Sequence, residues 1–547
     1  MRKLHQICLL IAFVCLATGV ARAQSFRVQC PASTITHPVA ANNDAEPAYT
    51  GPSYTGTSGF PAAPAKVNGA IKCQQISGGD GYATMGDGTQ TYMFSFGPLS
   101  GLADIAAGRP GTESPTVFND VYPAADLGAN PATLQPGDPA TTVDNAGAFT
   151  FNGAVGQVPD ADCLAANRAA GTGPLPCPNL PATGIDGHVD PRPIMDVGVM
   201  NGNIPAPLMA IDEDDEFFLT LTNVGMIMRP DLFEQHTVHF HGYPNASSFY
   251  DGVPDASVAI NIGGSFTYYY LAPDAGTYFW HCHITPPEHL QMGMVGQLYV
   301  RPRQNRVAVG SSLYAALQQQ QLDLRTACSS AADILCSNPL PADAGILPGQ
   351  TGATVATAGV KYAYNDGDGS TAYDVEYPLQ IHGFDPNFHF VGMTFNPEGF
   401  ADMKDKYFLL NGRSYPDTVT AGALETAAVD GKNHFSQPLN SIITIPHNGR
   451  ALLRISDLDV SEYQTLASLG IPMQVVGYNA KLLRDQAGNN MYYTTNSITL
   501  AGGESLDVIL NANGIPAGTY YLYTPNLDHL SNDAENFGGL MTEVHVN

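Results

Sequence analysis

The alternation of apolar and polar residues predicts strands in two separate parts of the chain. In the first part, residues 91–96 (TYMFSF) alternate, and strand-like segments return over residues 194–223. In the second part, strand-like segments begin near Tyr373 and include residues 409–418 and 451–460. A period of two places apolar side chains on one face of a strand. The pattern therefore predicts two strand-rich domains.

The segments around these domains are rich in Gly, Pro, Ser and Ala and show little periodicity. Residues 24–87, which have this composition, are predicted to form an N-terminal extension. Residues 104–187 indicate a long loop insertion within a first domain that spans residues 88–303. A linker over residues 304–372 then leads to the second domain, residues 373–547.

Residues 1–23 have the features of a cleaved export signal. Arg2 and Lys3 give a positive start, an apolar run follows, and Ala21-Arg22-Ala23 forms a small-residue cleavage site. The apolar run is too short to span a bilayer, and no later segment approaches the length that would be needed. We therefore expect no transmembrane anchor and a periplasmic or extracellular location.

Cysteine usage agrees with export. Of the nine cysteines, Cys8 and Cys15 lie in the predicted signal, and Cys282 belongs to the metal motif described below. The other six predict three disulfide bonds, because an even number in an exported protein favours oxidation. Fifteen connectivities are possible, and pairing in sequence order closes the shortest loops: Cys30 with Cys73, Cys163 with Cys177, and Cys328 with Cys336.

The composition argues against two classes of negatively charged partner. Charged residues make up 13% of the chain and the formal net charge is −27. A surface of this sign repels nucleic acid and anionic membranes, so neither is expected to bind. The acidic run 212–216 could attract a cation, but its position at a strand start favours a turn in contact with solvent.

The residues with the clearest chemistry follow the strands of the first domain. In an extended strand, His281 and His283 point to one face and Cys282, between them, points to the other. A thiolate, two imidazoles and a thioether form the blue-copper ligand set, which Cys282, His236, His289 and Met294 supply. His239 and His241 form a second pair at the same spacing and, with His281 and His283, could hold further copper.

This stretch closely resembles the multicopper oxidases, a family that includes laccases, metal oxidases and two-domain relatives. The likeness is carried by His-Thr-Val-His-Phe-His-Gly at 236–242, Asp251-Gly252, Ala-Gly-Thr-Tyr at 275–278, and His281-Cys282-His283 followed by His289 and Met294. The spacing from Cys282 to His289 is two residues longer than the usual form of the family, and Pro286-Pro287 lies within it.

The resemblance implies an all-β fold with two cupredoxin-like Greek-key β-barrel or sandwich domains and long loop insertions. It also implies a type 1 copper held by His236, Cys282, His289 and Met294, and half of a type 2/type 3 trinuclear cluster held by His239, His241, His281 and His283. The expected reaction is one-electron oxidation of a phenolic or metal-ion substrate coupled to the reduction of dioxygen. Asp251 is the candidate for proton delivery, and an ordinary turn aspartate is an equally weighted alternative.

An internal repeat shows what the second domain lacks. Residues 517–525 match residues 275–283 at a constant offset of 242, but Tyr523, Thr524 and Pro525 replace His281, Cys282 and His283. The remaining histidines of this domain are scattered, and each is expected to be an ordinary surface or core residue: His382, His389, His434, His447 and His529.

The ligand count predicts a homo-oligomer. In the family a trinuclear cluster takes eight histidines from two domains, and one chain of this protein offers four. A second copy would supply the others at an interface. Two alternatives stay open: a copper nitrite reductase, whose motif shares the spacing of His236 and His241 but does not use His239 and His283, and a type 1 electron-transfer or copper-binding protein without oxidase activity.

Overall fold

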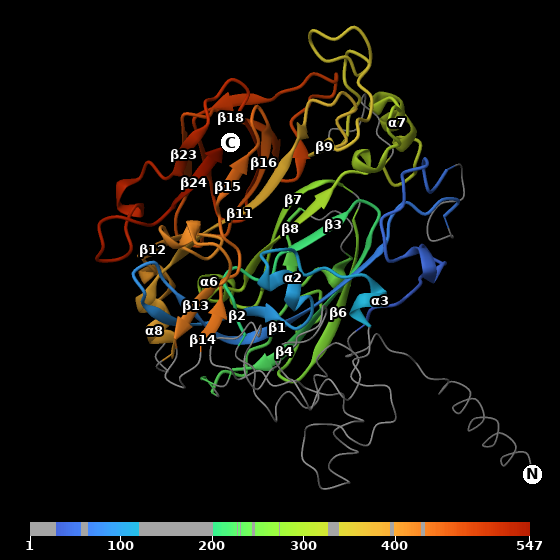
Figure 1. Ribbon diagram of the computed structural model, residues 1–547. Helices are drawn as coiled ribbons and strands as arrows, with labels where there is room; N and C mark the ends of the chain where they lie inside the picture. Colours follow the sequence, from blue (N-terminus) through green and yellow to red (C-terminus); the bar gives the residue numbers. More distant parts are fainter. Residues whose placement is uncertain are drawn as a thin grey trace, which may run out of the picture.

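The computed structural model describes residues 29–55, 64–119, 201–326, 338–393, 399–427 and 433–547, apart from residues 227, 230, 243–246 and 273. These residues form two strand-rich lobes, the first coloured blue to green and the second orange to red in Figure 1. The helices are short, and none in the described ranges is long and apolar enough to cross a membrane. The predicted all-β, cupredoxin-like fold class is confirmed.

The first lobe consists of two sheets of four strands each, in the orders β2-β1-β4-β6 and β3-β8-β7-β5. The strands of the first sheet are β1 (Ile71–Thr84), β2 (Gln90–Pro98), β4 (Glu216–Gly225) and β6 (Ser265–Leu271). The strands of the second are β3 (Met209–Asp212), β5 (His239–Phe240), β7 (Gly276–His281) and β8 (Val295–Arg301). Buried side chains from both sheets, among them Leu219, Trp280 and Leu298, form one apolar core.

The second lobe has two larger sheets, in the orders β12-β11-β16-β22-β18-β19, with β20 paired to β18, and β15-β24-β23-β17-β21. The first sheet contains β11 (Val375–Phe384), β12 (Tyr407–Leu410), β16 (Arg450–Asp457), β18 (Met473–Tyr478), β19 (Lys481–Leu482), β20 (Tyr493–Thr495) and β22 (Ser505–Asn511). The second contains β15 (Ile443–Ile445), β17 (Gln464–Leu469), β21 (Ser497–Leu500), β23 (Gly518–Tyr523) and β24 (Met541–Val546).

The two lobes repeat the same pairing pattern. β1 runs parallel to β4 and antiparallel to β2, and β11 runs parallel to β16 and antiparallel to β12. Likewise, β3 pairs parallel with β8, and β15 pairs parallel with β24. The strands β7 and β23 begin and end at residues that are 242 positions apart. The internal repeat predicted from the sequence is therefore confirmed as a repeat of structure.

The other described elements are small. Two short pairs of strands are β9 (Lys361–Tyr362) with β10 (Ala372–Tyr373), and β13 (Leu424–Ala427) with β14 (Asn433–Ser436). The α-helices are α2 (Leu102–Ala106), α3 (Pro115–Phe118), α6 (Pro286–Gln291), α7 (Leu313–Gln320) and α8 (Pro386–Met393). The 3-10 helices are η1 (Ala40–Asn42), η3 (Ser248–Tyr250), η4 (Arg303–Arg306), η5 (Phe400–Asp402), η6 (Asp417–Val419) and η7 (Leu527–His529).

Strand β1 lies within the segment that the sequence assigned to a loop-rich extension. It is a long strand in the middle of the first sheet, between β2 and β4. Its polar residues are buried and bonded: Ser77 donates to Asn201 at 2.6 Å, and Asp80 accepts from Tyr92 at 2.7 Å. Because polar side chains occupy both faces of this strand, the alternation that marks a half-buried strand is absent.

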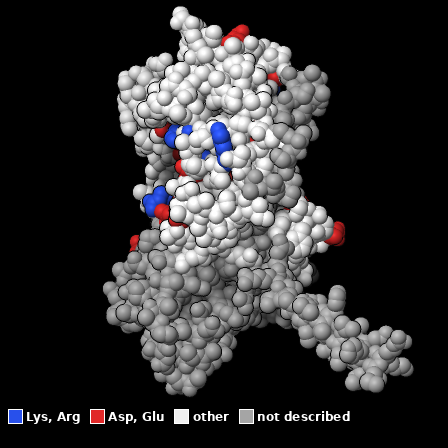
Figure 2. All heavy atoms as spheres, turned by 90° about the vertical axis from the view of Figure 1, so that its right-hand side faces the viewer, with Lys and Arg blue, Asp and Glu red and all other residues white. Residues whose placement is uncertain are grey.

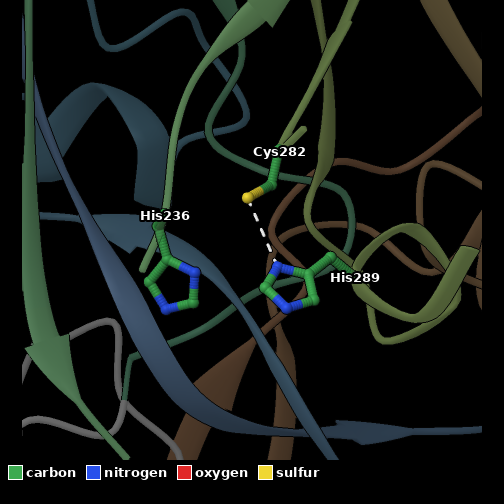
Figure 3. A group of neighbouring side chains, drawn as sticks. All are labelled: His236, Cys282 and His289. Carbon is green, nitrogen blue, oxygen red and sulfur yellow. Dashed lines mark hydrogen bonds between the residues drawn. The ribbon is translucent and has the colours of Figure 1, made fainter. Parts of the chain in front are cut away.

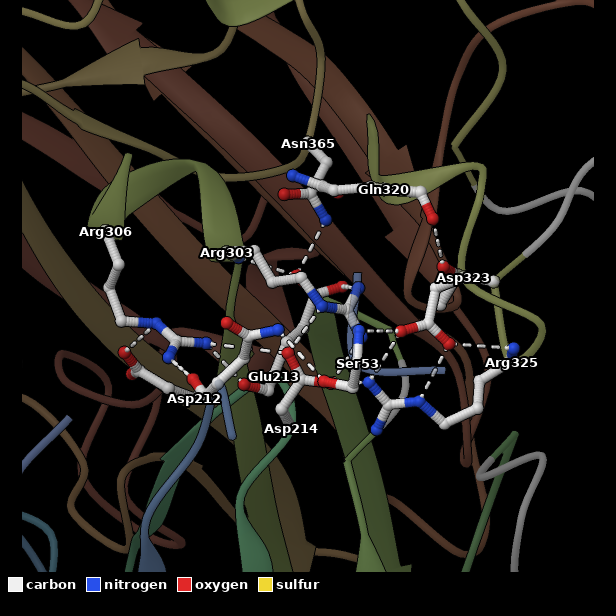
Figure 4. Close-up of polar contacts among 12 residues, drawn as sticks. Ser53, Asp212, Glu213, Asp214, Arg303, Arg306, Gln320, Asp323, Arg325 and Asn365 are labelled. Carbon is white, nitrogen blue, oxygen red and sulfur yellow. Dashed lines mark hydrogen bonds and ion pairs between the residues drawn. The ribbon is translucent and has the colours of Figure 1, made fainter. Parts of the chain in front are cut away.

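The expectation that the acidic run 212–216 is a turn in solvent is wrong. A turn is present, but Glu213 and Asp214 are buried, and Arg303 binds Asp214 through two nitrogens at 2.6 and 2.8 Å (Figure 4). Arg325 adds a further ion pair to Asp214 at 2.8 Å. Burial opposes ionisation of Asp214, but the charges of Arg303 and Arg325 outweigh it and lower its pKa. The acidic run is thus part of a buried ion-pair network, in which Asp214 is the ionised carboxylate.

The predicted disulfide between Cys30 and Cys73 is confirmed, with the two Cα atoms 5.8 Å apart. The four other cysteines that are predicted to pair, the predicted export signal and most of the predicted insertion 104–187 lie outside the described residues. On the face shown in Figure 2, the described Lys and Arg side chains lie near Asp and Glu, so this part of the surface has no extended basic patch.

Candidate copper sites

Three buried donor side chains meet beside the core of the first lobe. His236 follows β4 in an isolated bridge with Ile260, Cys282 directly follows β7, and His289 lies on α6. One ligand atom from each lies within 4.8 Å of the others, and His289 Nδ1 is 3.3 Å from Cys282 Sγ. Figure 3 shows the two rings and the thiol around a common space. The three are fully buried.

Backbone hydrogen bonds join the two ends of the segment from Cys282 to Met294. The Cys282 amide donates to Met294 O at 3.1 Å, and the Met294 amide donates to His289 O at 2.8 Å. Met294 is fully buried in the same apolar cluster as Cys282. The unusual pair Pro286-Pro287 begins α6, where a missing N–H costs no helical hydrogen bond. The longer spacing between Cys282 and His289 is therefore taken up by one short helix.

The donor atoms are arranged as ligands rather than as bonded core residues. Neither ring nitrogen of His236 has a hydrogen-bond partner among the described residues, and His289 Nε2 has none either. Buried polar atoms are normally paired, so the unpaired His236 ring, beside a thiol that His289 Nδ1 also contacts, fits a site for a soft, thiolate-binding metal such as copper. The amide of Thr237 donates to Cys282 Sγ at 3.4 Å, a contact suited to a thiolate.

Burial sets the protonation of these groups without a metal. It lowers the pKa of His236 to about 3 and that of His289 well below its usual value. It raises the pKa of the Cys282 thiol to about 11. The imidazoles are therefore neutral and ready to donate a lone pair, whereas the thiol must lose its proton when a metal binds.

Three further histidines meet on the opposite face of the same strand end. His239 on β5 pairs in register with His281 on β7, and His241 follows β5. His239 Nδ1 donates to Asp251 O at 2.6 Å, and His281 Nδ1 donates to Cys282 O at 2.6 Å. These bonds hold the proton on Nδ1 and leave the Nε2 lone pair for a metal.

The geometry brings the predicted half-site together. His241 Nε2 and His281 Nε2 are 2.9 Å apart, and the ring centroids of His239 and His283 are 5.1 Å apart. His239, His241 and His281 form the second group in the described residues that could share a metal ion, and the His283 ring stands beside it. Burial is the main cause that lowers the pKa of His241 to about 4.

The matched family model is described as multicopper oxidase and covers residues 186–305, which contain all eight predicted ligands. This segment of the chain matches the multicopper oxidase family. Among curated proteins, the chain is 31% identical over 128 residues to a laccase of Aspergillus fumigatus. It is 34% identical over 109 residues to a copper-containing nitrite reductase of Rhizobium meliloti. These matches cover 23% and 19% of this chain, and 20% and 26% of the respective relatives.

A solved blue copper oxidase from Nitrosomonas europaea is 22% identical, with a TM-score of 0.40, over 63% of this chain and 78% of that chain. The matched part of this chain spans about a fifth of the laccase. The comparisons with curated proteins therefore concern the segment that matches the multicopper oxidase family, and not a whole relative.

Asp251 lies beside the histidines of the half-site. Its carbonyl accepts from His239 Nδ1, as described above, and its Oδ2 is 3.6 Å from the same nitrogen. Gly252, which has a φ of +81°, packs against the backbone of Val238, where a Cβ would lie 2.0 Å from the carbonyl oxygen. The Asp-Gly pair is thus a tight turn that lies beside the half-site.

Two residues near the blue-copper group were not identified from the sequence. Gly78 on β1 lies against His236, and a Cβ at this position would stand 2.7 Å from Cδ2 of the ring. Glu234 is part-exposed, and its Oε2 is 4.0 Å from His289 Nε2. Gly78 is distant in sequence and carries no side chain to mark it. Glu234 could have been noticed, because it stands two residues before His236.

The second lobe keeps the scaffold of the site without its ligands. The amide of Thr524 donates to Leu540 O at 2.9 Å, in the way that Cys282 donates to Met294. The second lobe also covers one flank of the histidine half-site: a Cβ at Gly503 would lie 3.1 Å from His241 Nδ1.

Proposed function

We propose that the chain is an exported multicopper oxidase that couples one-electron oxidation of a small reductant to the reduction of dioxygen to water. The type 1 copper would be held by His236, Cys282, His289 and Met294, and half of a trinuclear cluster by His239, His241, His281 and His283. One observation carries this proposal: adjacent residues, His281 and Cys282, belong to two different donor groups. Copper bound there would supply the one-electron redox chemistry.

The link between the two groups supports electron transfer. A single peptide bond joins His281 to Cys282, and the His281 ring also donates to the Cys282 carbonyl. The route from thiol to half-site is therefore short, buried and covalent. Dioxygen reduction also consumes protons, and Asp251 is placed to pass them to the vicinity of His239.

Entry of electrons is proposed at the outer nitrogen of His289. Its Nδ1 faces the thiol and its buried Nε2 is 4.0 Å from Oε2 of the part-exposed Glu234, so electrons from a reductant bound near Glu234 would pass through the ring. Burial raises the pKa of Glu234, and the adjacent Phe233 side chain is 81% exposed. A carboxylate next to an exposed ring suits either a phenol, whose proton it could accept, or a metal cation.

The trinuclear cluster is proposed to be completed between copies of this chain. Among the described residues, one nitrogen from each of His239, His241 and His281 lies within 4.8 Å of the others. No fourth histidine of the described residues belongs to this group. An isologous contact around a twofold axis would place two such patches face to face and supply four ligands from each. The division into domains at residues 88–303 and 373–547, and export through residues 1–23, are parts of the same proposal.

A copper nitrite reductase is the second candidate. The group of three histidines and the similarity to the Rhizobium meliloti enzyme favour it. Oxygen uptake by the copper-loaded protein, measured with a phenol, Mn(II) or Fe(II) as reductant, tests the oxidase proposal. Nitrite consumption without oxygen uptake would favour the reductase, and neither activity in a blue protein would favour simple electron transfer.

A further inference from the structure

Helix α6, which carries His289, is bonded to buried polar groups of the second lobe. His382 Nε2 donates to Leu290 O at 3.0 Å. The Gln291 side chain donates to Asp405 Oδ1 at 2.9 Å and accepts from the amide of Asp385 at 3.0 Å. The side chains involved are almost completely buried, and Asp405, at 5%, is the most exposed of them.

His389 adds a contact of the same kind. Its Nε2 lies 2.9 Å from Gln291 O and its Nδ1 lies 2.7 Å from Tyr92 O on β2. A neutral imidazole has one N–H, so each tautomer donates to one of these two carbonyls of the first lobe. The ring is stacked on Phe384 with centroids 3.7 Å apart, which fixes its plane.

Apolar contacts run beside these bonds. Phe388 on α8 of the second lobe belongs to the same buried cluster as Cys282, Met292 and Met294. A Cβ at Gly392, one turn further along α8, would lie 3.8 Å from Met292 Sδ. The second lobe therefore contacts the copper segment through both polar and apolar side chains.

We propose that the second lobe, which has no ligands of its own at the repeated positions, positions the type 1 copper segment through His382 and Asp405. The inference rests on the proposed function, because it requires that His289 binds copper. A helix of six residues is not stable by itself, so its place depends on what it packs against. Metal ligands must be held to within about 0.5 Å, which the bonds to Leu290 and Gln291 would ensure.

The test compares three variants of the full chain. His382→Leu removes the donor to Leu290 O, and His382→Gln keeps an amide N–H in the same region. The matched control is His529→Leu, because His529 is also a buried histidine of the second lobe but contacts Gln464 and Phe408 instead of α6. Copper affinity by chelator competition, the visible and EPR spectra of type 1 copper, and the unfolding midpoint are measured for each.

We expect His382→Leu to lower copper affinity by about ten- to hundredfold, the usual effect of losing a group that orients a ligand, and to alter the type 1 spectrum. His382→Gln should recover most of the affinity. His529→Leu should lower the unfolding midpoint while it leaves affinity and spectrum unchanged. If His382→Leu does not fold, Gln291→Met removes the bonds to Asp385 and Asp405 from the other side and should give the same loss.

Two results would overturn the inference. Wild-type spectrum and affinity in His382→Leu, or in Gln291→Met where that variant replaces it, would show that the lobe does not position the ligand. The proposed function would stand in that case. A copper-loaded wild-type protein without a type 1 band would overturn the proposed function and the inference together.

Discussion

Replacing Gly78 by alanine tests whether the first lobe leaves room for a ligand ring. The added Cβ would stand 2.7 Å from Cδ2 and 3.2 Å from Cγ of His236, whereas carbon atoms in contact are about 3.5 to 4.0 Å apart. Either the ring or the strand must therefore move by about 1 Å, which exceeds the tolerance of a metal site. Overpacking of this kind costs about 1 to 3 kcal/mol of unfolding free energy.

Gly79→Ala is the matched control. Its Cβ would meet Val224 at 2.5 Å and the carbonyl of Gly225 at 2.8 Å, so it strains the same strand without touching a ligand. We expect both variants to lose stability in chemical unfolding, but only Gly78→Ala to lose type 1 absorbance and bind copper more weakly. Equal absorbance and equal copper affinity in Gly78→Ala and the wild type would refute the reasoning.

Three further results are expected. Cys282→Ser should abolish the visible band and oxygen uptake, because an alcohol does not replace the thiolate; a variant that keeps either would remove Cys282 from the site. Copper loading should quench the fluorescence of Trp280, the single tryptophan, which is fully buried next to His281; equal emission of metal-free and loaded protein would count against this. Burial raises the pKa of Glu113 to about 8, so the folded chain holds a proton that the unfolded chain loses near 4.5. The unfolding free energy should therefore fall as pH rises from about 4.5 to 8, and Glu113→Gln should remove this part of the slope; an unchanged slope would contradict the assignment.

The candidate copper ligands could be identified in the sequence because their spacing is local. His281, Cys282 and His283 alternate along one strand end, and alternation alone assigns them to two faces. The repeat at an offset of 242 is also a local comparison of two segments, and it matches the two lobes. Features that depend on spacing within one strand or turn could thus be predicted from the sequence.

Contacts between segments that are distant in sequence could not be predicted from the sequence. Gly78 lies against His236 only because β1 enters the sheet beside β4. The acidic run 212–216 is buried because Arg303 and Arg325 come from far along the chain to pair with it. His382 and His389 were expected to be ordinary histidines, and their buried contacts with α6 depend on how the two lobes pack.

The central claim is that copper sites on this chain, completed by a second copy, reduce dioxygen. The most direct measurement determines copper per chain, oxygen uptake and mass in solution on the same purified sample. We expect an oligomer that holds more than one copper per chain and reduces dioxygen to water. A monomer that still reduces dioxygen to water, or an oligomer with one copper per chain, would contradict the account.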